Sequence, residues 1–408
     1  MKTIRPYNPE TDREAVQAIW REVGWLEKDQ NKPMDLMFDA SRAMVSDLRG
    51  NAECLVITSS ASMRYLDADL PLTAVTGVTT SRIARKRGIA RKTLTHALIR
   101  DVEDGAILAG LSMFDQGYYE LLGFGTGGYE VWVDFDPSTL SVPAHVRSPI
   151  RLGKADGERM HAARLARLRG HGSVNFDHPA ITTAELEWAK NGFGLGYEED
   201  GDLSHFIFCD AEDVEYGPYT VWFSAYRDHQ QFLELLSLLK SLGDQIHKVT
   251  MRQPPAVQMQ DFLNRPFRLR RKTEKGKFSN RLRASAYWQM RILDLPACLE
   301  KTHLSCPTLR FNLSLSDPLE TLLPANATWR GCGGDYIVEI GAESSAQPGH
   351  DPSLPLLTAS VGALTRLWLG VLPASSLVVS DHLSGPAALL RALDKAFRLP
   401  PPHPDWEY

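Results

Sequence analysis

A strand, a basic turn and a helix follow one another directly in residues 72–98, and this order limits the chain to folds that mix strands with helices. The segment L-T-A-V-T-G-V-T-T, residues 72–80, is rich in β-branched residues and short enough for a buried strand. Gly77 within it predicts a bulge or a close approach of another backbone. Leu94 and Leu98 share one face of the helix that follows. We therefore expect a mixed α/β fold with a central sheet.

The turn and the first helical residues carry a dense positive charge. Six cations lie within eleven residues with no acid between them: Arg82, Arg85, Lys86, Arg87, Arg91 and Lys92. The whole chain has a formal net charge of −5, so the protein is acidic apart from this cluster. The cluster would attract a compact polyanion. Because the net charge is negative, we do not expect the protein to bind nucleic acids.

The sequence R-K-R-G-I-A, residues 85–90, places a glycine where the helix begins. Unpaired backbone N–H groups and the helix dipole favour an anion at that point, and glycine lets the backbone approach a diphosphate closely. R-x-x-G-x-A is common by chance, and a solvated basic turn is the alternative interpretation. The strand before the motif and the helix after it favour the anion site.

The chain has 408 residues, which is too long for a single core and predicts three units. The first unit, residues 1–149, ends in a proline-containing connection. The second unit, residues 150–287, repeats the order of strands and helices without a glycine-containing basic turn, so we expect it to have lost the anion site. The third unit, residues 288–408, ends in the tail L-P-P-P-H-P-D-W-E-Y, which is too rich in proline for a helix and should run extended.

Several classes of protein are not expected from this sequence. No run of 18 apolar residues and no signal-peptide core are present, so we expect a cytoplasmic protein that does not contact the membrane. The five cysteines are odd in number and lack C-x-x-C spacing, which fits reduced thiols better than disulfides or a zinc site. We expect no bound metal.

Together with F-D-Q-G-Y-Y-E-L-L-G-F-G, residues 114–125, the basic motif resembles the Gcn5-related N-acetyltransferase (GNAT) superfamily and, within it, the enhanced intracellular survival (Eis) family. That family joins an active acetyltransferase unit, a degenerate second one and a unit similar to sterol carrier proteins. The resemblance therefore implies two tandem GNAT-like mixed-sheet units, the second degenerate, and a sterol-carrier-protein-like α+β unit. It also implies acetyl-CoA as cosubstrate and a homohexamer.

The resemblance further implies where acetyl-CoA binds. A splayed strand would pair with the pantetheine arm, and the basic turn would wrap the pyrophosphate. The implied cofactor-binding residues are Val78, Thr79, Thr80, Lys86, Arg87, Gly88, Ile89, Ala90, Arg91, Phe114 and Asp115. Val78 would donate its N–H toward the thioester oxygen. Phe114 is interpreted equally well as a core residue.

Tyr119 corresponds to the general acid of the resembled family. Direct acetyl transfer leaves a thiolate that needs a proton, and a phenol with a pKa of about 10 can supply one. The adjacent Tyr118 is an alternative, but the spacing to the G-F-G of residues 123–125 favours Tyr119. Simple packing under a short helix is the other interpretation of this side chain.

The resemblance assigns the general base to the terminal carboxylate, which here belongs to Tyr408. A free α-carboxylate has a pKa of about 3.5, so it is a weak base unless burial raises this value or a water relays the proton. A frayed terminus is the usual alternative. Trp406 and Tyr408 argue against fraying, since disordered tails seldom carry two large aromatic residues so close together.

The expected acceptor is an amine of a small molecule or a peptide. In the resembled family, aromatic and acidic residues line the pocket for cationic amines, and these suit an aminoglycoside-like molecule, a polyamine or a lysine. The candidate residues are Trp20, Trp25, Glu27, Asp29, Asp405 and Glu407. Two other functions stay open: the third unit allows a carrier of lipids or other hydrophobic ligands, and the cofactor site alone allows an acetyl-CoA sensor without turnover.

We expect removal of Tyr408 to lower turnover by about a hundredfold or more, because the terminal carboxylate moves back by one residue to Glu407, while acetyl-CoA still binds. Thiol release in the presence of an amine measures turnover, and thermal shift with acetyl-CoA measures binding. Amidation of the terminus is the matched control, since it removes the charge and keeps the side chain. Full turnover after either change excludes the terminal carboxylate as the base.

Overall fold

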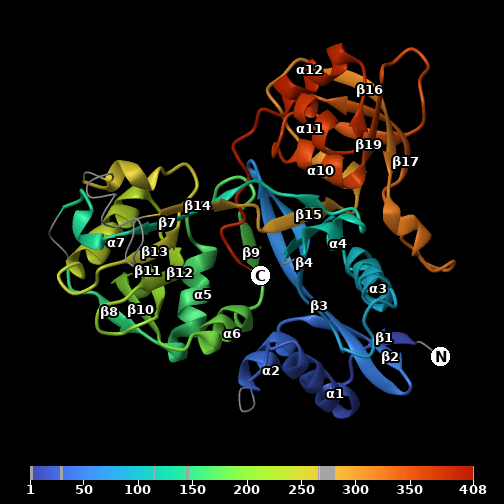
Figure 1. Ribbon diagram of the computed structural model, residues 1–408. Coiled ribbons are helices and arrows are strands. Elements are labelled where there is room, and N and C mark those ends of the chain that lie inside the picture. Colours follow the sequence, from blue (N-terminus) through green and yellow to red (C-terminus); the bar gives the residue numbers. More distant parts are fainter. Residues whose placement is uncertain are drawn as a thin grey trace.

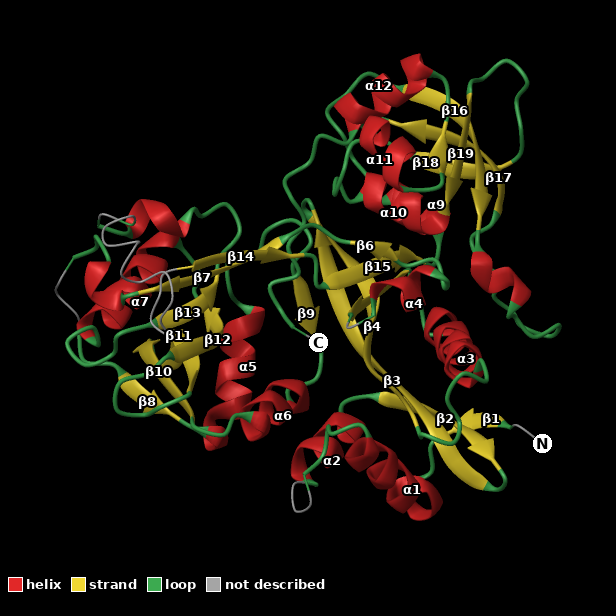
Figure 2. Ribbon diagram, in the orientation of Figure 1, coloured by secondary structure: helices red, strands yellow, loops and turns green. Residues whose placement is uncertain are grey.

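The computed structural model describes residues 3–27, 31–113, 115–143, 147–264, 266 and 281–407. It contains three β-sheets, of eight, seven and five strands, with helices packed beside them (Figure 1, Figure 2). The mixed α/β fold expected from the sequence is confirmed. Among the described helices, none combines the length and the apolar composition needed to cross a membrane.

The first sheet contains the strand that precedes the basic turn. Its strand order is β1, β2, β3, β4, β5, β15, β6, and β9 pairs with β3. The strands are β1 (Ile4–Pro6), β2 (Arg42–Leu48), β3 (Asn51–Tyr65), β4 (Ala68–Thr80), β5 (Leu108–Ser112), β6 (Gly125–Thr126), β9 (Val174–Phe176) and β15 (Trp288–Ile292). The accompanying helices are α1 (Pro9–Glu22), α2 (Lys32–Asp39), α3 (Ile89–Glu103) and α4 (Gln116–Glu120). Both α1 and α3 pack against β3.

The second sheet has the strand order β14, β7, β13, β12, β11, β10, β8. Its strands are β7 (Glu130–Phe135), β8 (Ile150–Leu152), β10 (Gly192–Glu199), β11 (Asp202–Ala211), β12 (Tyr219–Ala225), β13 (Val249–Arg252) and β14 (Arg281–Ser285). The helices of this part are α5 (Gly157–Leu165), α6 (Ala180–Trp188) and α7 (His229–Ser241). Short 3₁₀ helices are η1 (Pro137–Thr139), η2 (Lys154–Asp156) and η3 (Met259–Phe262).

The third sheet has the strand order β18, β17, β16, β19, β20. Its strands are β16 (Leu309–Ser316), β17 (Gly334–Ile340), β18 (Ser345–Pro348), β19 (Leu356–Ser360) and β20 (Leu383–Ser384). The helices are α9 (Leu295–Glu300), α10 (Val361–Trp368), α11 (Ala374–Ser380) and α12 (Ala387–Ala396), with the 3₁₀ helix η4 (Pro318–Thr321).

Three strands lie in sheets other than those of the units that the sequence predicted for them. β7 falls within residues 1–149 but pairs with β13 and β14 in the second sheet. β15 begins the predicted third unit but runs antiparallel to β5 in the first sheet, and β9 of the second unit pairs with β3. An alternating pattern identifies a strand but not its partner, because pairing depends on faces that meet only in the folded chain. The division at residues 149 and 287 stays a prediction.

A buried ion pair joins the first sheet to the third unit. Arg291 on β15 and Asp317 at the start of η4 are both fully buried, with 2.6 Å between Nη2 and Oδ2. Asp317 also accepts hydrogen bonds from the backbone N–H groups of Leu319 and Cys332, each at 3.0 Å. Arg291 in turn donates to the carbonyl of Leu122, which precedes β6. Each charge therefore has several partners in a site without water contact.

We expect Asp317→Ala to lower the free energy of unfolding by about 3–5 kcal/mol, because it leaves the Arg291 guanidinium buried without its carboxylate. Urea denaturation followed by tryptophan fluorescence measures the change. Glu339→Ala is the matched control, since Glu339 pairs with Arg310 on the exposed surface at 3.3 Å and should cost less than about 1 kcal/mol. Equal losses in the two variants would contradict the structural role of the buried pair.

Candidate active site

The parallel strands β4 and β5 lie side by side at one end and diverge at the other. Their described pairing is Leu72 with Leu108, Thr73 with Ala109 and Ala74 with Gly110. β4 nevertheless continues to Thr80, where it still pairs with β3. Residues 75–80 of β4 therefore have a partner strand on one edge only, and their backbone groups on the other edge are left for a ligand.

A bulge in β4 marks the beginning of this divergence. Ile57 of β3 lies opposite Gly77, whereas the next residue, Thr58, lies opposite Val75, so Thr76 is an extra residue in β4. A bulge bends its strand and increases the local twist. The bulge that Gly77 predicted is confirmed.

The basic turn leads from β4 into α3, and Gly88 is the N-cap of this helix. Its φ of 69° lies in the left-handed region that favours glycine. No side chain caps the helix and its first turn contains no acid, so its first N–H groups are available to an anion. The turn is fixed against α1, because Arg82 donates both its backbone N–H and its guanidinium to Glu22.

Most of the residues implied to bind acetyl-CoA lie on the divergent part of β4 or on the turn that leads into α3. Val78, Thr79 and Thr80 lie on the divergent part of β4, and residues 86–91 form the end of the turn and the start of α3. The side chains of Lys86 and Arg87 are exposed there. Asp115 is the N-cap residue of α4, and Phe114 lies outside the described residues. The individual cofactor contacts stay predictions.

Tyr119 is a buried residue of α4, with 7% of its surface exposed. Burial, with a smaller contribution from the charge of Asp115, raises the pKa of its phenol to about 12. The neighbouring ring of Tyr118 lies edge to face at 5.0 Å between centroids. The Tyr118 hydroxyl is buried without a hydrogen-bond partner among the described residues, and burial raises its pKa as well. Both phenols therefore keep their protons at neutral pH, and Tyr118 stays an alternative donor.

The C-terminal tail returns from the third unit to the centre of the molecule, between the first and second sheets (Figure 1). Its described part, up to Glu407, is neither helix nor strand, as its prolines predicted. The backbone of the tail bonds to the second unit: Val174 donates to Pro404 at 2.8 Å, and His403 donates to His171 at 2.9 Å. A β carbon on Gly172 would lie 2.6 Å from the nitrogen of His403, so glycine is required for this approach.

Side chains of the second unit also bind the tail. Arg167 binds both carboxylate oxygens of Asp405, with Nη2–Oδ1 at 2.7 Å and Nε–Oδ2 at 2.9 Å. The buried indole of Trp406 lies under the guanidinium of Arg164, whose Cζ is 3.5 Å from the ring centroid. Its N–H donates to Glu185 at 3.2 Å. The tail is anchored through Trp406, while Tyr408 lies outside the described residues.

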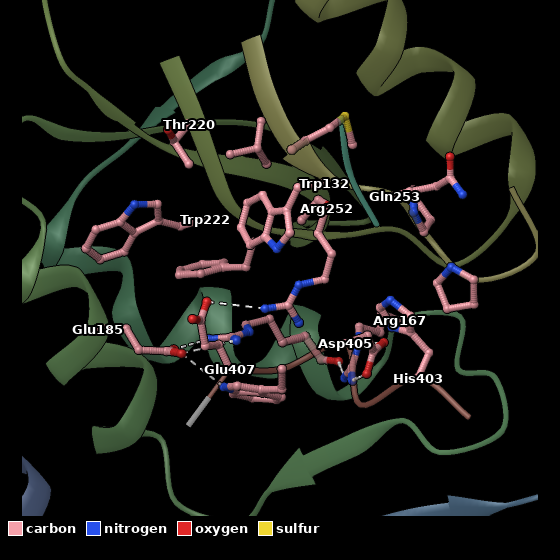
Figure 3. A pocket seen from close by; sticks show the side chains of 18 of the residues that line it. Trp132, Arg167, Glu185, Thr220, Trp222, Arg252, Gln253, His403, Asp405 and Glu407 are labelled. Atoms are coloured by element: carbon pink, nitrogen blue, oxygen red, sulfur yellow. Dashed lines mark hydrogen bonds and ion pairs between the residues drawn. The ribbon is translucent and has the colours of Figure 1, made fainter. Parts of the chain in front are cut away.

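A cavity of about 570 Å³, which we call the aromatic cavity, lies between the second sheet, the α5–α6 region and the tail (Figure 3). Its aromatic lining consists of Trp132, Trp188, Trp222, Phe223, Tyr226, Tyr287 and Trp406. Ser112, the last residue of β5, also lines it. The cavity therefore reaches the strand whose divergence from β4 forms the candidate cofactor site.

The second sheet has a divergence of its own, and the aromatic cavity occupies it. β12 pairs with β13 over Tyr219–Val221 only, although β12 continues to Ala225. The helix after β12 is α7, whose N-cap Asp228 accepts a hydrogen bond from the N–H of Gln231 at 2.9 Å. A carboxylate at this position satisfies the helix terminus and repels an anion. The Asp228 cap agrees with the expected loss of the anion site in this unit, which stays a prediction.

The residues expected to attract a cationic acceptor have other partners. Asp405 binds Arg167, Glu407 binds Arg252 at 3.2 Å, and Glu27 binds Lys190 at 3.2 Å. Trp20 is a core residue packed against α2 and β3, and Asp29 lies outside the described residues. Trp25 is exposed and lies over the bulge, 3.5 Å from the place where a β carbon of Gly77 would be.

Sequence reasoning missed the three arginines that bind the tail and the tryptophans that line the cavity. Arg164, Arg167 and Arg252 lie far from residues 405–407 in sequence, and no local pattern connects them. The tryptophans of T-V-W-F-S-A and V-W-V, residues 220–225 and 131–133, were a usable signal, because large aromatics on two strands favour a shared face. Finding that face requires knowing that β7 belongs to the second sheet.

Comparison with known proteins establishes the fold. No model of a protein family matches the chain, and no curated protein matches it in sequence. Among solved structures, a GCN5-related N-acetyltransferase from Anabaena variabilis shares 14% identity and a TM-score of 0.78, with 100% of each chain covered. Eis1 from Mycobacterium abscessus shares 16% identity and a TM-score of 0.76, also with 100% of each chain covered. A probable N-acyltransferase from Enterococcus faecalis shares 15% identity and a TM-score of 0.77, over 97% of this chain and 96% of that one. The fold of the chain is therefore that of GCN5-related N-acetyltransferases.

We expect Arg167→Met to release the tail, because the carboxylate of Asp405 loses a bidentate partner that is nearly buried. Carboxypeptidase Y followed by mass spectrometry should then remove residues beyond Trp406 about tenfold faster or more, as local opening becomes easier. Arg151→Met on β8 is the matched control, since that side chain is exposed and far from the tail in the second sheet. Equal digestion of both variants contradicts the anchoring role.

Proposed function

We propose that the protein is an acetyl-CoA-dependent N-acetyltransferase that acts on an amine. The observation that carries the proposal is the divergence of β4 and β5 beside the uncapped start of α3. An open strand edge offers hydrogen bonds to the amides of a pantetheine arm, and the helix start with its cations suits a pyrophosphate. The shared fold supports the proposal, because the solved structures that carry it include N-acetyltransferases.

Acetyl-CoA supplies the acetyl group as a thioester when bound. In this proposal the backbone of Val78, Thr79 and Thr80 holds the pantetheine arm, and Val78 directs its N–H at the thioester oxygen. Residues 86–91 hold the pyrophosphate through backbone N–H groups and the cations Lys86, Arg87 and Arg91. Asp115 and Phe114 flank the arm further along.

Tyr119 is the proposed general acid, which gives its phenolic proton to the departing sulfur. With a pKa raised to about 12, the phenol stays protonated over the neutral range in which the enzyme would work. The raised pKa makes Tyr119 a weaker acid than an unperturbed phenol. The proton transfer in this proposal therefore follows the departure of the sulfur, which leaves a thiolate beside the phenol.

The carboxylate of Tyr408 is the proposed general base, which takes a proton from the ammonium group of the acceptor. Support comes from the residues just before it, since Asp405, Trp406 and Glu407 lie in the aromatic cavity that reaches Ser112. One peptide unit spans about 3.8 Å between α carbons, so the terminus lies within one residue of Glu407. The described part of the tail therefore ends, at Glu407, in the cavity that Ser112 of β5 also lines, which supports the proposal.

The identities of the three units belong to the same proposal. Residues 1–149 form the catalytic unit, residues 150–287 the degenerate GNAT-like unit, and residues 288–408 a sterol-carrier-protein-like unit that delivers the tail. The carboxylate cap on α7 supports degeneracy, and the return of the tail to the centre supports delivery. A homohexamer is proposed on family resemblance and can be tested by light scattering.

One apolar cavity in the third unit gives no support to the alternative of a carrier of hydrophobic ligands. This cavity, among residues such as Leu295, Phe311 and Trp368, has a volume of only about 10 Å³. Such a space accommodates a single water molecule at most, whereas a lipid tail needs hundreds of Å³. An acetyl-CoA sensor without turnover is separated from an enzyme by the response to loss of Tyr119.

We expect Tyr119→Phe to lower kcat by about a hundredfold, because the proton donor is lost, with little change in the thermal shift caused by acetyl-CoA. Thiol release measures kcat. Tyr118→Phe is the matched control, since it removes the neighbouring hydroxyl from the same helix and should retain most of the rate. A large loss of kcat in Tyr118→Phe alone would make Tyr118 the general acid in place of Tyr119. Unchanged kcat in both variants would exclude either phenol as the general acid.

A further inference from the structure

Flat aromatic side chains line the aromatic cavity, and the guanidinium of Arg252 lies over the ring of Trp132, with 5.4 Å between Cζ and the ring centroid. Trp132 on β7 and Trp222 on β12 are each only partly buried, and Figure 3 shows them on the sheet side, across from Glu185, Glu407 and Asp405. Tyr287 and Trp188 are more exposed still and line the same space. Indole and phenol faces of this kind bind flat aromatic groups by stacking and by removing apolar surface from water.

Three carboxylates that line the aromatic cavity are paired with arginines. Glu185 pairs with Arg164, Asp405 with Arg167 at 2.7 Å, and Glu407 with Arg252 at 3.2 Å, so three carboxylates face three guanidinium groups. Arg164 and Arg167 are buried, and a buried arginine without its partner is strongly destabilising. Glu185 and Asp405 are therefore held in place by their arginines.

One carboxylate can still accept a single ammonium group. Arg252 has a second partner in Glu130, with 3.1 Å between Nη1 and Oε1, so it stays paired if Glu407 turns away. Glu407 is half exposed, whereas Glu130 is buried. Glu407 is also the residue before the proposed base, so an ammonium group that it binds lies close to the end of the tail.

The imidazole of His403 adds a polar contact on the wall of the aromatic cavity. Both ring nitrogens are buried without a hydrogen-bond partner among the described residues. Burial lowers the pKa of His403 to about 4, so the ring is neutral and offers one donor and one acceptor.

We infer that the acceptor is an arylalkylamine, a flat aromatic ring that carries one primary amine on a short alkyl chain. The ring binds against Trp132 and Trp222, and the amine lies toward Glu407 and Ser112. This inference rests on the proposed acetyl transfer and narrows its substrate class. The sequence left the acceptor open between an aminoglycoside-like molecule, a polyamine and a lysine, and the inference adds a further class of amine to these.

Thiol release with acetyl-CoA compares tryptamine and tyramine with spermidine and kanamycin. We expect kcat/KM to be at least about tenfold higher for the two aromatic amines. Trp222→Ala should raise the KM for tryptamine about tenfold and leave the KM for acetyl-CoA unchanged, as expected for the loss of one stacking surface. Tyr129→Ala, which removes an exposed aromatic outside the aromatic cavity, is the matched control.

Trp188→Ala is a second variant in case Trp222→Ala does not fold, since Trp188 is more exposed and its removal costs less packing. Preference for spermidine or kanamycin, with their KM unchanged in both variants, overturns the inference and leaves acetyl transfer standing. If no amine is acetylated although acetyl-CoA binds, the proposed function fails instead. Titration calorimetry then tests the site alone: tryptamine binding that weakens about tenfold in the variants supports it, and no binding overturns it.

Discussion

The separation of β4 from β5 after only three paired residues is the constraint on which the rest of this molecule depends. An extra residue, Thr76, bends β4 away, while β3 keeps β4 in register as far as Thr80. On the other side, β5 pairs along its whole length with β15, a strand contributed by the chain after residue 287. The opening is therefore held by neighbours on both sides. Because Arg291 of β15 also binds Asp317, the third unit is tied to the same arrangement.

The second sheet and the C-terminal tail enclose the aromatic cavity, which reaches β5 beside the opening between β4 and β5. The second sheet keeps a divergence like that of the first, but Asp228 caps the helix that would otherwise attract an anion. Aromatic side chains line the space instead, and Arg167 holds the tail there through Asp405. The aromatic cavity of the second sheet thereby reaches Ser112, the last residue of β5.

Local patterns in the sequence predicted the elements and the candidate cofactor site. The strand of residues 72–80, the uncapped glycine at residue 88 and the extended tail follow from side-chain and backbone preferences within a few residues. The partners of β7 and β15 could not be predicted, since each pairs with a strand far away in sequence. The same holds for Arg167, which lies 238 residues from Asp405. Without that pairing, Asp405 and Glu407 were interpreted as free acids that attract a cationic acceptor.

The central claim is that the opening between β4 and β5 binds acetyl-CoA. A crystal structure of the protein with coenzyme A tests it most directly. The account predicts the pantetheine arm along residues 75–80 of β4, and the pyrophosphate against the N–H groups that follow Gly88. Coenzyme A bound elsewhere, or absent at concentrations that saturate acetyltransferases of the same fold, would contradict the account.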